Sequence, residues 1–179
     1  MNARACLAIL LFAAAPAGAA ILNDVHSQLN PTSVEAVFTP RSTVEIQTAV
    51  KLAIQEDLPI SIGGGRHAMG GQQFGAGNLH IDMSSMTRVV GLDTKNGLVT
   101  VEAGATWPVL VDWLNNSQKD ASAPWGIRQK QSGADRLTIG GALSANAHGR
   151  GLAMRPIIAD VESFTLVDAS AELLVCSRT

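Results

Sequence analysis

The segment from residue 63 to residue 77 restricts the fold of this 179-residue chain most, because seven of its fifteen residues are glycine. It follows the short apolar run Ile60-Ser61-Ile62 and reads Gly-Gly-Gly-Arg-His-Ala-Met-Gly-Gly-Gln-Gln-Phe-Gly-Ala-Gly. This many glycines destabilise both helix and strand, so the segment is predicted to be a long loop. Glycine also lets the backbone approach a ligand closely, with exposed N–H groups that bind oxygen anions such as a diphosphate.

Three kinds of ligand-binding loop share such glycines, and the neighbouring residues separate them. A phosphate-binding P-loop requires Lys and then Ser or Thr after its second glycine, whereas Gly70 is followed here by Gly71-Gln72. A Rossmann loop must begin a helix, which the glycines after Met69 prevent. The third kind is a non-helical loop that wraps the diphosphate of a dinucleotide. A flexible surface loop with a solvated histidine stays open as the alternative on these residues alone.

His67 is the reactive side chain of this loop, in which Arg66 is the only other ionisable residue. A neutral imidazole beside such a loop can act as a nucleophile, a base or a metal ligand. No Cys or acidic residue stands at ligand spacing between His67 and His80, so the pattern predicts no metal site. His80 alternates with Leu79 and Ile81, so we expect it on the opposite face of a strand, next to solvent.

Hydrophobic periodicity predicts helices and short strands around the loop. Ser42-Thr43-Val44-Glu45 is a capping box followed by apolar residues at helical spacing, which predicts a helix from about Thr43 to Gln55. A second helix is predicted from Thr106 to about Leu114, with Pro108 in its first turn. Strands are predicted at 59–62, 79–83, 89–92, 98–101, 161–167 and 172–177, and residues 115–137 are predicted to form loop structure. The Asn96-Gly97 dipeptide indicates a hairpin.

Several blocks in a fixed order carry a family resemblance. The loop block Gly64–Gln72, the strand block Leu79–Met86, and the later blocks Val99–Trp107 and Thr138–Ser144 resemble the vanillyl-alcohol oxidase/para-cresol methylhydroxylase (PCMH-type) flavoprotein superfamily. The resemblance runs from about Val37 to the end of the chain and implies FAD as the cofactor. It also implies an α+β fold of two α/β subdomains with FAD between them. In this family the FAD domain continues and a substrate domain follows, so we expect the chain to be truncated at its C-terminus.

The resemblance assigns the cofactor site to two glycine-rich segments. In this family the second segment, residues 138–151, lies against the FAD diphosphate and isoalloxazine from the side opposite the first loop. A short helix beginning at Gly140-Gly141 would point its N-terminal N–H groups at an anion or at the flavin edge, and tight helix packing is the alternative. The candidate FAD-binding residues are Gly63, Gly64, Gly65, Arg66, His67, Ala68, Met69, Gly70, Gln72, Gly140, Gly141, Ser144, Asn146, His148, Gly149 and Val161.

The resemblance also implies a covalent bond at His67. In related oxidases a Gly-His-Ser loop places a histidine nitrogen where it attacks the flavin 8α-methyl carbon. Arg66 and Ala68 stand here in place of that glycine and serine, so the hydrogen bonds that orient the ring can differ. Contact with the flavin without a bond, and a bystander role, stay open for His67.

The first nineteen residues are predicted to be a signal peptide. Arg4 precedes the apolar stretch Leu7–Ala15, and Ala17-Gly18-Ala19 is a small-x-small cleavage site. A retained anchor is the alternative, because Ala5–Leu22 is barely long enough to span a bilayer. We expect an exported protein, periplasmic or secreted, without stable membrane insertion. The chain is then divided into a signal peptide at residues 1–19, an N-terminal lead-in at residues 20–36 and an FAD-binding domain at residues 37–179.

These expectations converge on an exported FAD-dependent oxidoreductase. We expect it to oxidise a CH–OH or CH–NH donor in a small-molecule substrate and to pass the electrons to oxygen or another acceptor. A non-catalytic flavin-binding module, or an inactive truncated remnant, is the alternative. The formal net charge of −2 gives no reason to expect nucleic acid as a partner. No residue of the chain is assigned as a catalytic base.

Overall fold

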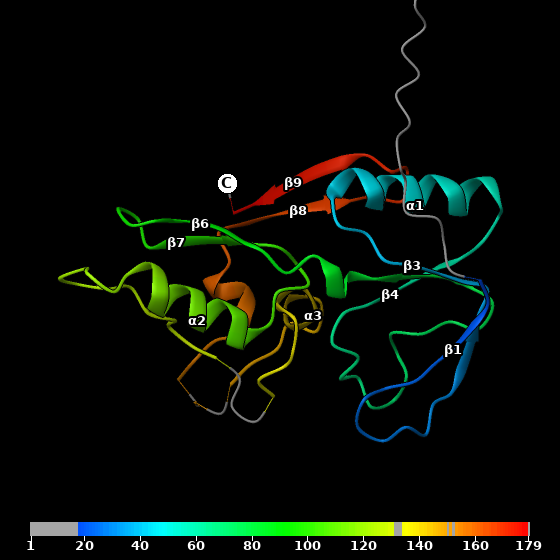
Figure 1. Ribbon diagram of the computed structural model, residues 1–179, viewed down its shortest axis with the longest axis horizontal. Coiled ribbons are helices and arrows are strands. Elements are labelled where there is room, and N and C mark those ends of the chain that lie inside the picture. Colours follow the sequence, from blue (N-terminus) through cyan, green and yellow to red (C-terminus); the bar gives the residue numbers. More distant parts are fainter. Residues whose placement is uncertain (1–17, 131–133, 150, 152, 179) are drawn as a thin grey trace, which may run out of the picture.

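The structure is a computed structural model that describes residues 18–130, 134–149, 151 and 153–178 (Figure 1). The predicted signal peptide lies outside the described residues except for residues 18 and 19. Arg150, in the second glycine-rich segment assigned to the cofactor site, also lies outside them. Among the described helices, none is both long enough and apolar enough to cross a bilayer. A parallel sheet with one crossover helix forms most of the first half and antiparallel hairpins dominate the second half, which makes this a mixed α/β fold.

The first half is built on a three-stranded parallel sheet in the order β3 (Ala36–Phe38), β5 (Leu79–Asp82), β4 (Ile60–Gly63). Helix α1 (Thr43–Gln55) connects β3 to β4 and buries Ala49 and Ala53 against Phe38 of the sheet. The Ser42 hydroxyl accepts a hydrogen bond from the Glu45 N–H at 3.2 Å and so caps the helix. The helix predicted at these residues is therefore confirmed.

The lead-in before the sheet is itself ordered. Strand β1 (Ala20–Leu22) pairs antiparallel with β2 (Thr32–Val34), and residues 23–31 form the loop between them. The sequence pattern predicts neither strand, because three residues are too few for an alternation to show. The loop of this hairpin reaches the glycine-rich segment that follows β4, where the Val25 N–H donates to the Arg66 carbonyl.

The second half has its own hydrophobic core. Strands β6 (Val89–Asp93) and β7 (Leu98–Val101) form the predicted hairpin, and Gly97 takes a left-handed φ of 68° in its turn. Helices α2 (Trp107–Ser117) and α3 (Ile139–Ser144), with the 3₁₀ helix η2 (Ile157–Asp160), pack beside it. Another 3₁₀ turn, η1 (Met83–Ser85), is capped by Asp82, whose carboxylate accepts from the Ser84 N–H.

The C-terminal hairpin carries several exposed apolar side chains. Strands β8 (Ser163–Val167) and β9 (Leu173–Ser177) pair antiparallel, as predicted, and lie beside α1 in Figure 1. The Gln47 side chain of α1 donates to the Ala171 carbonyl in the turn at 2.8 Å. Even so, Leu166, Leu173 and Val175 are 46%, 48% and 76% exposed, so the hairpin offers apolar side chains to solvent among the described residues.

His80 corrects one expectation, because its side chain is buried and not next to solvent. Alternation places it on the face of β5 opposite Leu79 and Ile81, but the Phe74 ring of the glycine-rich segment covers that face, with its centroid 5.5 Å from the His80 ring. The His80 Nδ1 atom lies 2.9 Å from the Ser61 hydroxyl, and its Nε2 has no partner among the described residues. Burial lowers the pKa of His80, Arg66 lowers it further, and Asp82 opposes this shift.

The lowered pKa of His80 predicts a loss of stability on mild acidification. The folded chain holds a proton on His80 less readily than the unfolded chain, whose histidine titrates near 6.5. The contribution of His80 to stability is therefore fully present above pH 6.5 and is lost as the pH drops below that value. We expect the free energy of unfolding, measured with urea, to be lower at about pH 5.5 than at about pH 8. In His80→Gln the pH dependence should shrink, and an unchanged dependence would show that His80 does not contribute.

Candidate functional site

The glycine-rich loop is held by hydrogen bonds from the lead-in. The Val25 N–H donates to the Arg66 carbonyl at 3.0 Å, and the Asn30 amide donates to the Met69 carbonyl at 2.7 Å. The Ser27 hydroxyl reaches the same Met69 oxygen at 3.3 Å. These bonds lie on both sides of His67, so they fix the backbone of the loop where its reactive side chain stands.

Asp24 organises the lead-in loop that makes these contacts. Its buried carboxylate accepts hydrogen bonds from the backbone N–H groups of His26 and Ser27, from the Ser27 hydroxyl and from the Asn30 amide, at 2.6–2.9 Å. Burial alone would raise the pKa of Asp24, but the hydrogen bonds from Asn30, Ser27 and His26 hold it well below its usual range. The ionised carboxylate thus shapes the loop without a cationic partner among the described residues.

The loop leaves four successive N–H groups free. Among the described residues, the backbone N–H groups of Gly65, Arg66, His67 and Ala68 donate no hydrogen bond. Because a peptide unit is planar and trans, the Arg66 carbonyl that faces Val25 turns the His67 N–H the other way. Arg66 has a left-handed φ of 55°, and such a change of hand lets successive N–H groups converge on an anion. These residues therefore fit a diphosphate.

The glycines before Arg66 allow two segments of the chain to approach each other closely. Gly71 and Gly77 have a positive φ later in this loop, whereas Gly64 and Gly65 do not. A Cβ atom on Gly65 would instead lie 2.7 Å from the Arg136 carbonyl oxygen, and one on Gly64 would overlap the Thr138 hydroxyl. Residues 64–65 thus touch residues 136–138, and the two glycine-rich parts of the sequence meet in space.

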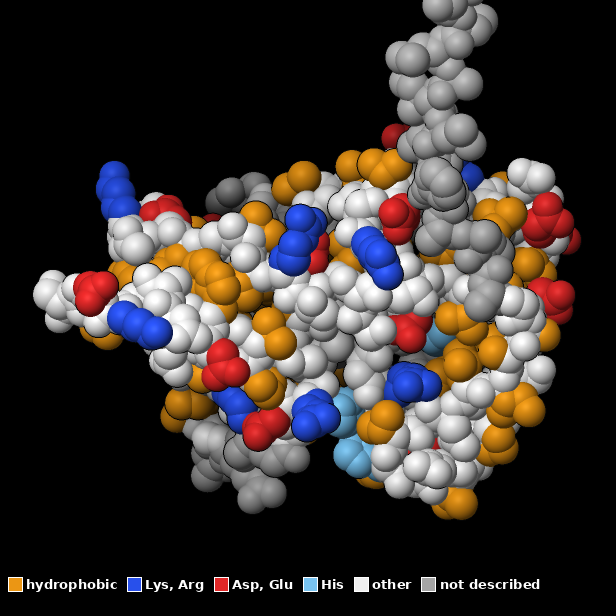
Figure 2. Space-filling view, in the orientation of Figure 1, with side chains coloured by type: hydrophobic (Ala, Val, Ile, Leu, Met, Phe, Trp, Pro, Cys, Tyr) orange, Lys and Arg blue, Asp and Glu red, His pale blue; other side chains and the backbone are white. Residues whose placement is uncertain are grey.

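His67 sits where these segments meet. Its Nδ1 atom lies 2.7 Å from Nε2 of His26, and the ring centroids are 4.7 Å apart at an angle of 57°. Figure 2 shows histidine side chains together on this face, with Lys or Arg side chains close by. Partial burial lowers the pKa of His67, as do the charges of His26 and Arg136, whereas a hydrogen bond with the Arg136 backbone raises it. The shift favours a neutral imidazole, which is the nucleophilic form.

The N–H groups at the start of the second glycine segment were expected to face an anion or the flavin edge, but they bind protein groups. The Ile139 and Gly140 N–H groups each donate at 2.8 Å to the carbonyls of Ala105 and Ala103, and the Gly141 N–H donates to the Thr138 hydroxyl. A Cβ atom on Gly140 would lie 2.8 Å from that of Ala103. The start of α3 is therefore packed and capped by protein groups.

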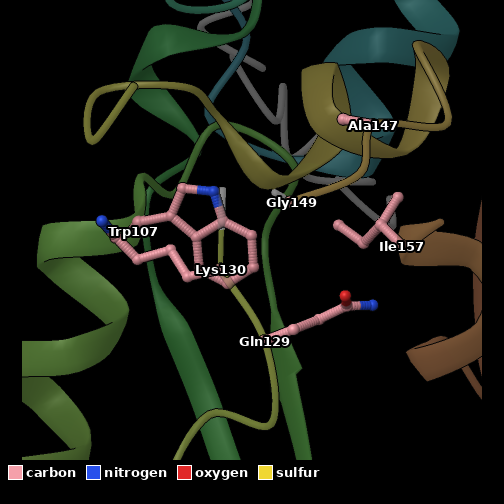
Figure 3. Close-up of a pocket in the computed structure, with 6 residues that line it drawn as sticks. All are labelled: Trp107, Gln129, Lys130, Ala147, Gly149 and Ile157. Carbon is pink, nitrogen blue, oxygen red and sulfur yellow. The ribbon is translucent and has the colours of Figure 1, made fainter. Parts of the chain in front are cut away.

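The other candidates in this segment lie beyond α3. Ser144, Asn146 and His148 are exposed, and Asn146 has a left-handed φ of 43°. Gly149 and Ala147 line a cavity of about 10 Å³ with Trp107, Gln129, Lys130 and Ile157, which Figure 3 shows with Trp107 on one side and Ile157 on the other. The cavity has the size of a single water molecule and cannot admit a flavin ring.

Val161 lies in a different place from the glycine-rich loop. It lines a surface hollow of about 520 Å³ together with Phe164, Cys176 and Arg178, and its carbonyl accepts from the Arg178 side chain at 2.9 Å. No glycine of the first loop lines that hollow. The described residues contain no group of three His, Cys, Asp or Glu side chains that could hold a metal ion.

The sequence pattern predicts the glycine-rich loop but not the lead-in residues that hold it. Asp24 and His26 belong to the segment set aside as a lead-in, and the contact of His26 with His67 spans 41 positions of sequence. The only available signal was the polar run Asn23-Asp24-Val25-His26-Ser27 between short apolar stretches, which indicates a turn and nothing more specific.

The comparisons with known proteins agree with this geometry. Residues 34–177 match the family model described as an FAD binding domain. The chain is 30% identical over 146 residues to L-gulonolactone oxidase of Bos taurus, covering 81% of this chain and 31% of that protein. It is also 29% identical over 150 residues to glucooligosaccharide oxidase of Sarocladium strictum, covering 80% of this chain and 28% of that protein.

A solved structure supports the fold. The carbohydrate oxidase of Microdochium nivale superposes with a TM-score of 0.67 at 24% identity, over 82% of this chain and 30% of that one. The chain thus spans about a third of the length of these three proteins. A family model that covers most of the chain, together with a loop that fits a diphosphate, identifies the family: the chain belongs to the PCMH-type FAD-binding domains of the vanillyl-alcohol oxidase superfamily, with FAD as the cofactor.

Proposed function

We propose that the chain is the FAD-binding part of an exported FAD-dependent oxidoreductase that oxidises a small molecule. One observation carries the binding role, namely the four free N–H groups of residues 65–68 beside a neutral histidine. These groups would hold the diphosphate, and the guanidinium groups of Arg66 and Arg136 nearby would offset its charge. Bound FAD supplies the redox chemistry, and the chain binds and orients it.

A CH–OH donor is the better supported of the two donor types. Relatives include L-gulonolactone oxidase and a D-lactate dehydrogenase of Anaerostipes hadrus, whose names describe a lactone of a polyhydroxy acid and a hydroxy acid. Both molecules carry a carbinol group. The names include oxidases as well as dehydrogenases, so either oxygen or another acceptor would take the electrons from the flavin. Export through residues 1–19 belongs to the same proposal.

We place substrate binding and the catalytic base in further protein that covers the flavin. The chain spans about a third of its relatives, and the exposed apolar side chains of β8 and β9 suit contact with such a part. A non-catalytic flavin-binding module is the second candidate. The same loop would serve both, so only turnover of a donor distinguishes them.

His67 is the proposed point of covalent attachment. A ring nitrogen of His67 would form the bond to the 8α-methyl carbon in place of one C–H bond, whose proton would be released. The two electrons would be taken up by the bound FAD and passed to dioxygen or another acceptor, which is the redox chemistry that the cofactor would supply. The lowered pKa of His67 supports this role because it keeps a lone pair on the ring at neutral pH.

Replacement of His67 tests the attachment. We expect FAD to stay with the wild-type chain after acid precipitation, since a covalent bond survives unfolding, and to be released from His67→Ala. The measurement is flavin absorbance in the washed precipitate. Retained flavin in His67→Ala would exclude His67 as the attachment point.

Substitution of Gly65 tests the proposed diphosphate cradle, which is formed by the N–H groups of residues 65–68. Alanine at this position would place Cβ against the Arg136 carbonyl and force residues 65 and 136 apart, so Gly65→Ala should bind FAD at least about tenfold more weakly, the equivalent of 1.4 kcal/mol. Gly126→Ala is the matched control, because no atom lies within 4 Å of a Cβ there. Fluorescence titration with FAD measures both. Equal affinities would contradict the proposed cradle.

A further inference from the structure

His80 contacts the glycine-rich loop near both of its ends, and nothing in the proposed function uses it. Its side chain is 1% exposed, on the face of the sheet that the loop covers. At the start of the loop, a Cβ atom on Gly63 would lie 2.9 Å from His80 Nε2, so the imidazole fills the space that this glycine leaves. Toward the end of the loop, the Phe74 ring packs on the imidazole with a centroid distance of 5.5 Å. The loop therefore closes over this one ring.

Only one of the two nitrogens of the buried ring has a hydrogen-bond partner. Nδ1 lies 2.9 Å from the Ser61 hydroxyl of β4, and Nε2 has no partner among the described residues. Two charged groups act on the ring in opposite directions, Asp82 of its own strand and Arg66 of the loop. Its neighbours in the register of the sheet are uncharged, namely Ser61 of β4 and Val37 of β3. A proton on both nitrogens would therefore bury a charged N–H group without an acceptor.

Movement of the loop is the way in which the structure can accommodate this proton. The backbone of Ser61 is paired with that of His80 in the parallel ladder of β4 and β5, so neither strand can move away alone. The Phe74 N–H donates to the Gly71 carbonyl, a bond within the loop that does not join Phe74 to the sheet. Displacement of the Phe74 ring would bring water to the imidazolium and solvate its charge. Neutral His80 thus favours a closed loop, and protonated His80 favours an open one.

Hydrogen bonds within the loop connect Phe74 to the proposed diphosphate site. The Phe74 N–H donates to the Gly71 carbonyl at 2.9 Å, and the Gly71 N–H donates to the Ala68 carbonyl at 3.2 Å. Ala68 is the last of the four residues whose N–H groups donate no hydrogen bond among the described residues. Two hydrogen bonds therefore pass a displacement of Phe74 on to residues 65–68.

We propose that His80 is a proton-sensitive positioning residue for the glycine-rich loop: neutral His80 lets the loop close and hold FAD, and protonation of His80 opens the loop and weakens FAD binding. This inference rests on the proposed function of residues 65–68 as the diphosphate site. The diphosphate of FAD is esterified on both sides and takes up no proton in the range where histidines titrate. Protonation of His26 and His67 beside the loop would strengthen the binding of an anion, so their effect has the opposite sign.

Fluorescence titration of the full chain with FAD at about pH 8 and about pH 5.5 tests the proposal. Every chain carries His67→Ala, which keeps FAD binding reversible and removes one histidine of opposite effect. We expect the ratio of the Kd at the lower pH to the Kd at the higher pH to be about threefold to tenfold larger with His80 than with His80→Gln. About tenfold is the limit for one proton at one pH unit below 6.5. Equal ratios would overturn the proposal.

A second variant tests the part played by Phe74. Phe74→Ala uncovers the imidazole, so protonation of His80 no longer requires the loop to move, and the ratio should fall to that of His80→Gln. Phe164→Ala is the matched control, because it makes the same change at a partly exposed ring of β8, and it should keep the larger ratio. A ratio in Phe74→Ala as large as in the control would overturn the proposed coupling through this ring.

Nuclear magnetic resonance spectra of the chain without FAD separate this inference from the proposed function. The Cε1–H signal of His80 reports its protonation, and the amide signals of Phe74 and Ala68 report the position of the loop. We expect the amide signals to shift together with the His80 signal as the pH falls, and to stay in place in a folded His80→Gln chain. Loop signals that do not follow His80 would overturn the proposal. Loop signals that follow His80 in a chain that binds no FAD would instead overturn the diphosphate site, and with it the link to FAD.

Discussion

The hydrogen bond from the Val25 N–H to the Arg66 carbonyl is the contact on which the rest of the site depends. It turns the carbonyl of Arg66 toward the lead-in, so the His67 N–H of the same peptide unit faces the other way. Without an external partner, a loop with so many glycines would sample many conformations, because glycine loses the most conformational freedom on folding. The lead-in limits that freedom, and the buried carboxylate of Asp24 in turn fixes the lead-in.

Glycines of the loop act on the side that faces the second half of the chain, opposite the lead-in. At Gly64 and Gly65 the absence of a side chain lets the loop touch Thr138 and Arg136, which belong to the second half of the chain. The two hydrophobic cores, one beneath α1 and one around α2, are thereby brought together at the glycine-rich segments. Three features then coincide in one place: free backbone N–H groups, guanidinium charge and a neutral histidine with a defined partner.

The sequence predicted the elements whose signals are local. The capping box of α1, the Asn96-Gly97 turn and the alternation in β8 and β9 each depend on residues a few positions apart, and each is confirmed. The glycine-rich loop was also predicted, since its composition excludes regular structure. Its agreement with the family model confirms the FAD assignment.

Long-range contacts could not be predicted in the same way. Alternation gave the face of His80 but not the Phe74 ring that covers it. The glycines at the start of α3 suggested N–H groups open to a ligand, and the carbonyls of Ala103 and Ala105 take two of them. His26 lay in a segment without periodicity, and its contact with His67 appears only when the loop folds onto the lead-in. For α3 and for His26 a residue distant in sequence supplies the partner, and for His80 the glycine-rich segment that precedes β5 folds back over the strand.

Backbone amide spectra of the ¹⁵N-labelled chain during titration with FAD test the central claim most directly, because they observe the N–H groups themselves. The structure predicts that the amide signals of Gly65, Arg66, His67 and Ala68 shift on binding, since these groups gain an acceptor, while those of Ile139 and Gly140 keep their protein partners and shift less. Binding of FAD that leaves the signals of residues 65–68 unchanged would contradict the claim that this loop holds the diphosphate.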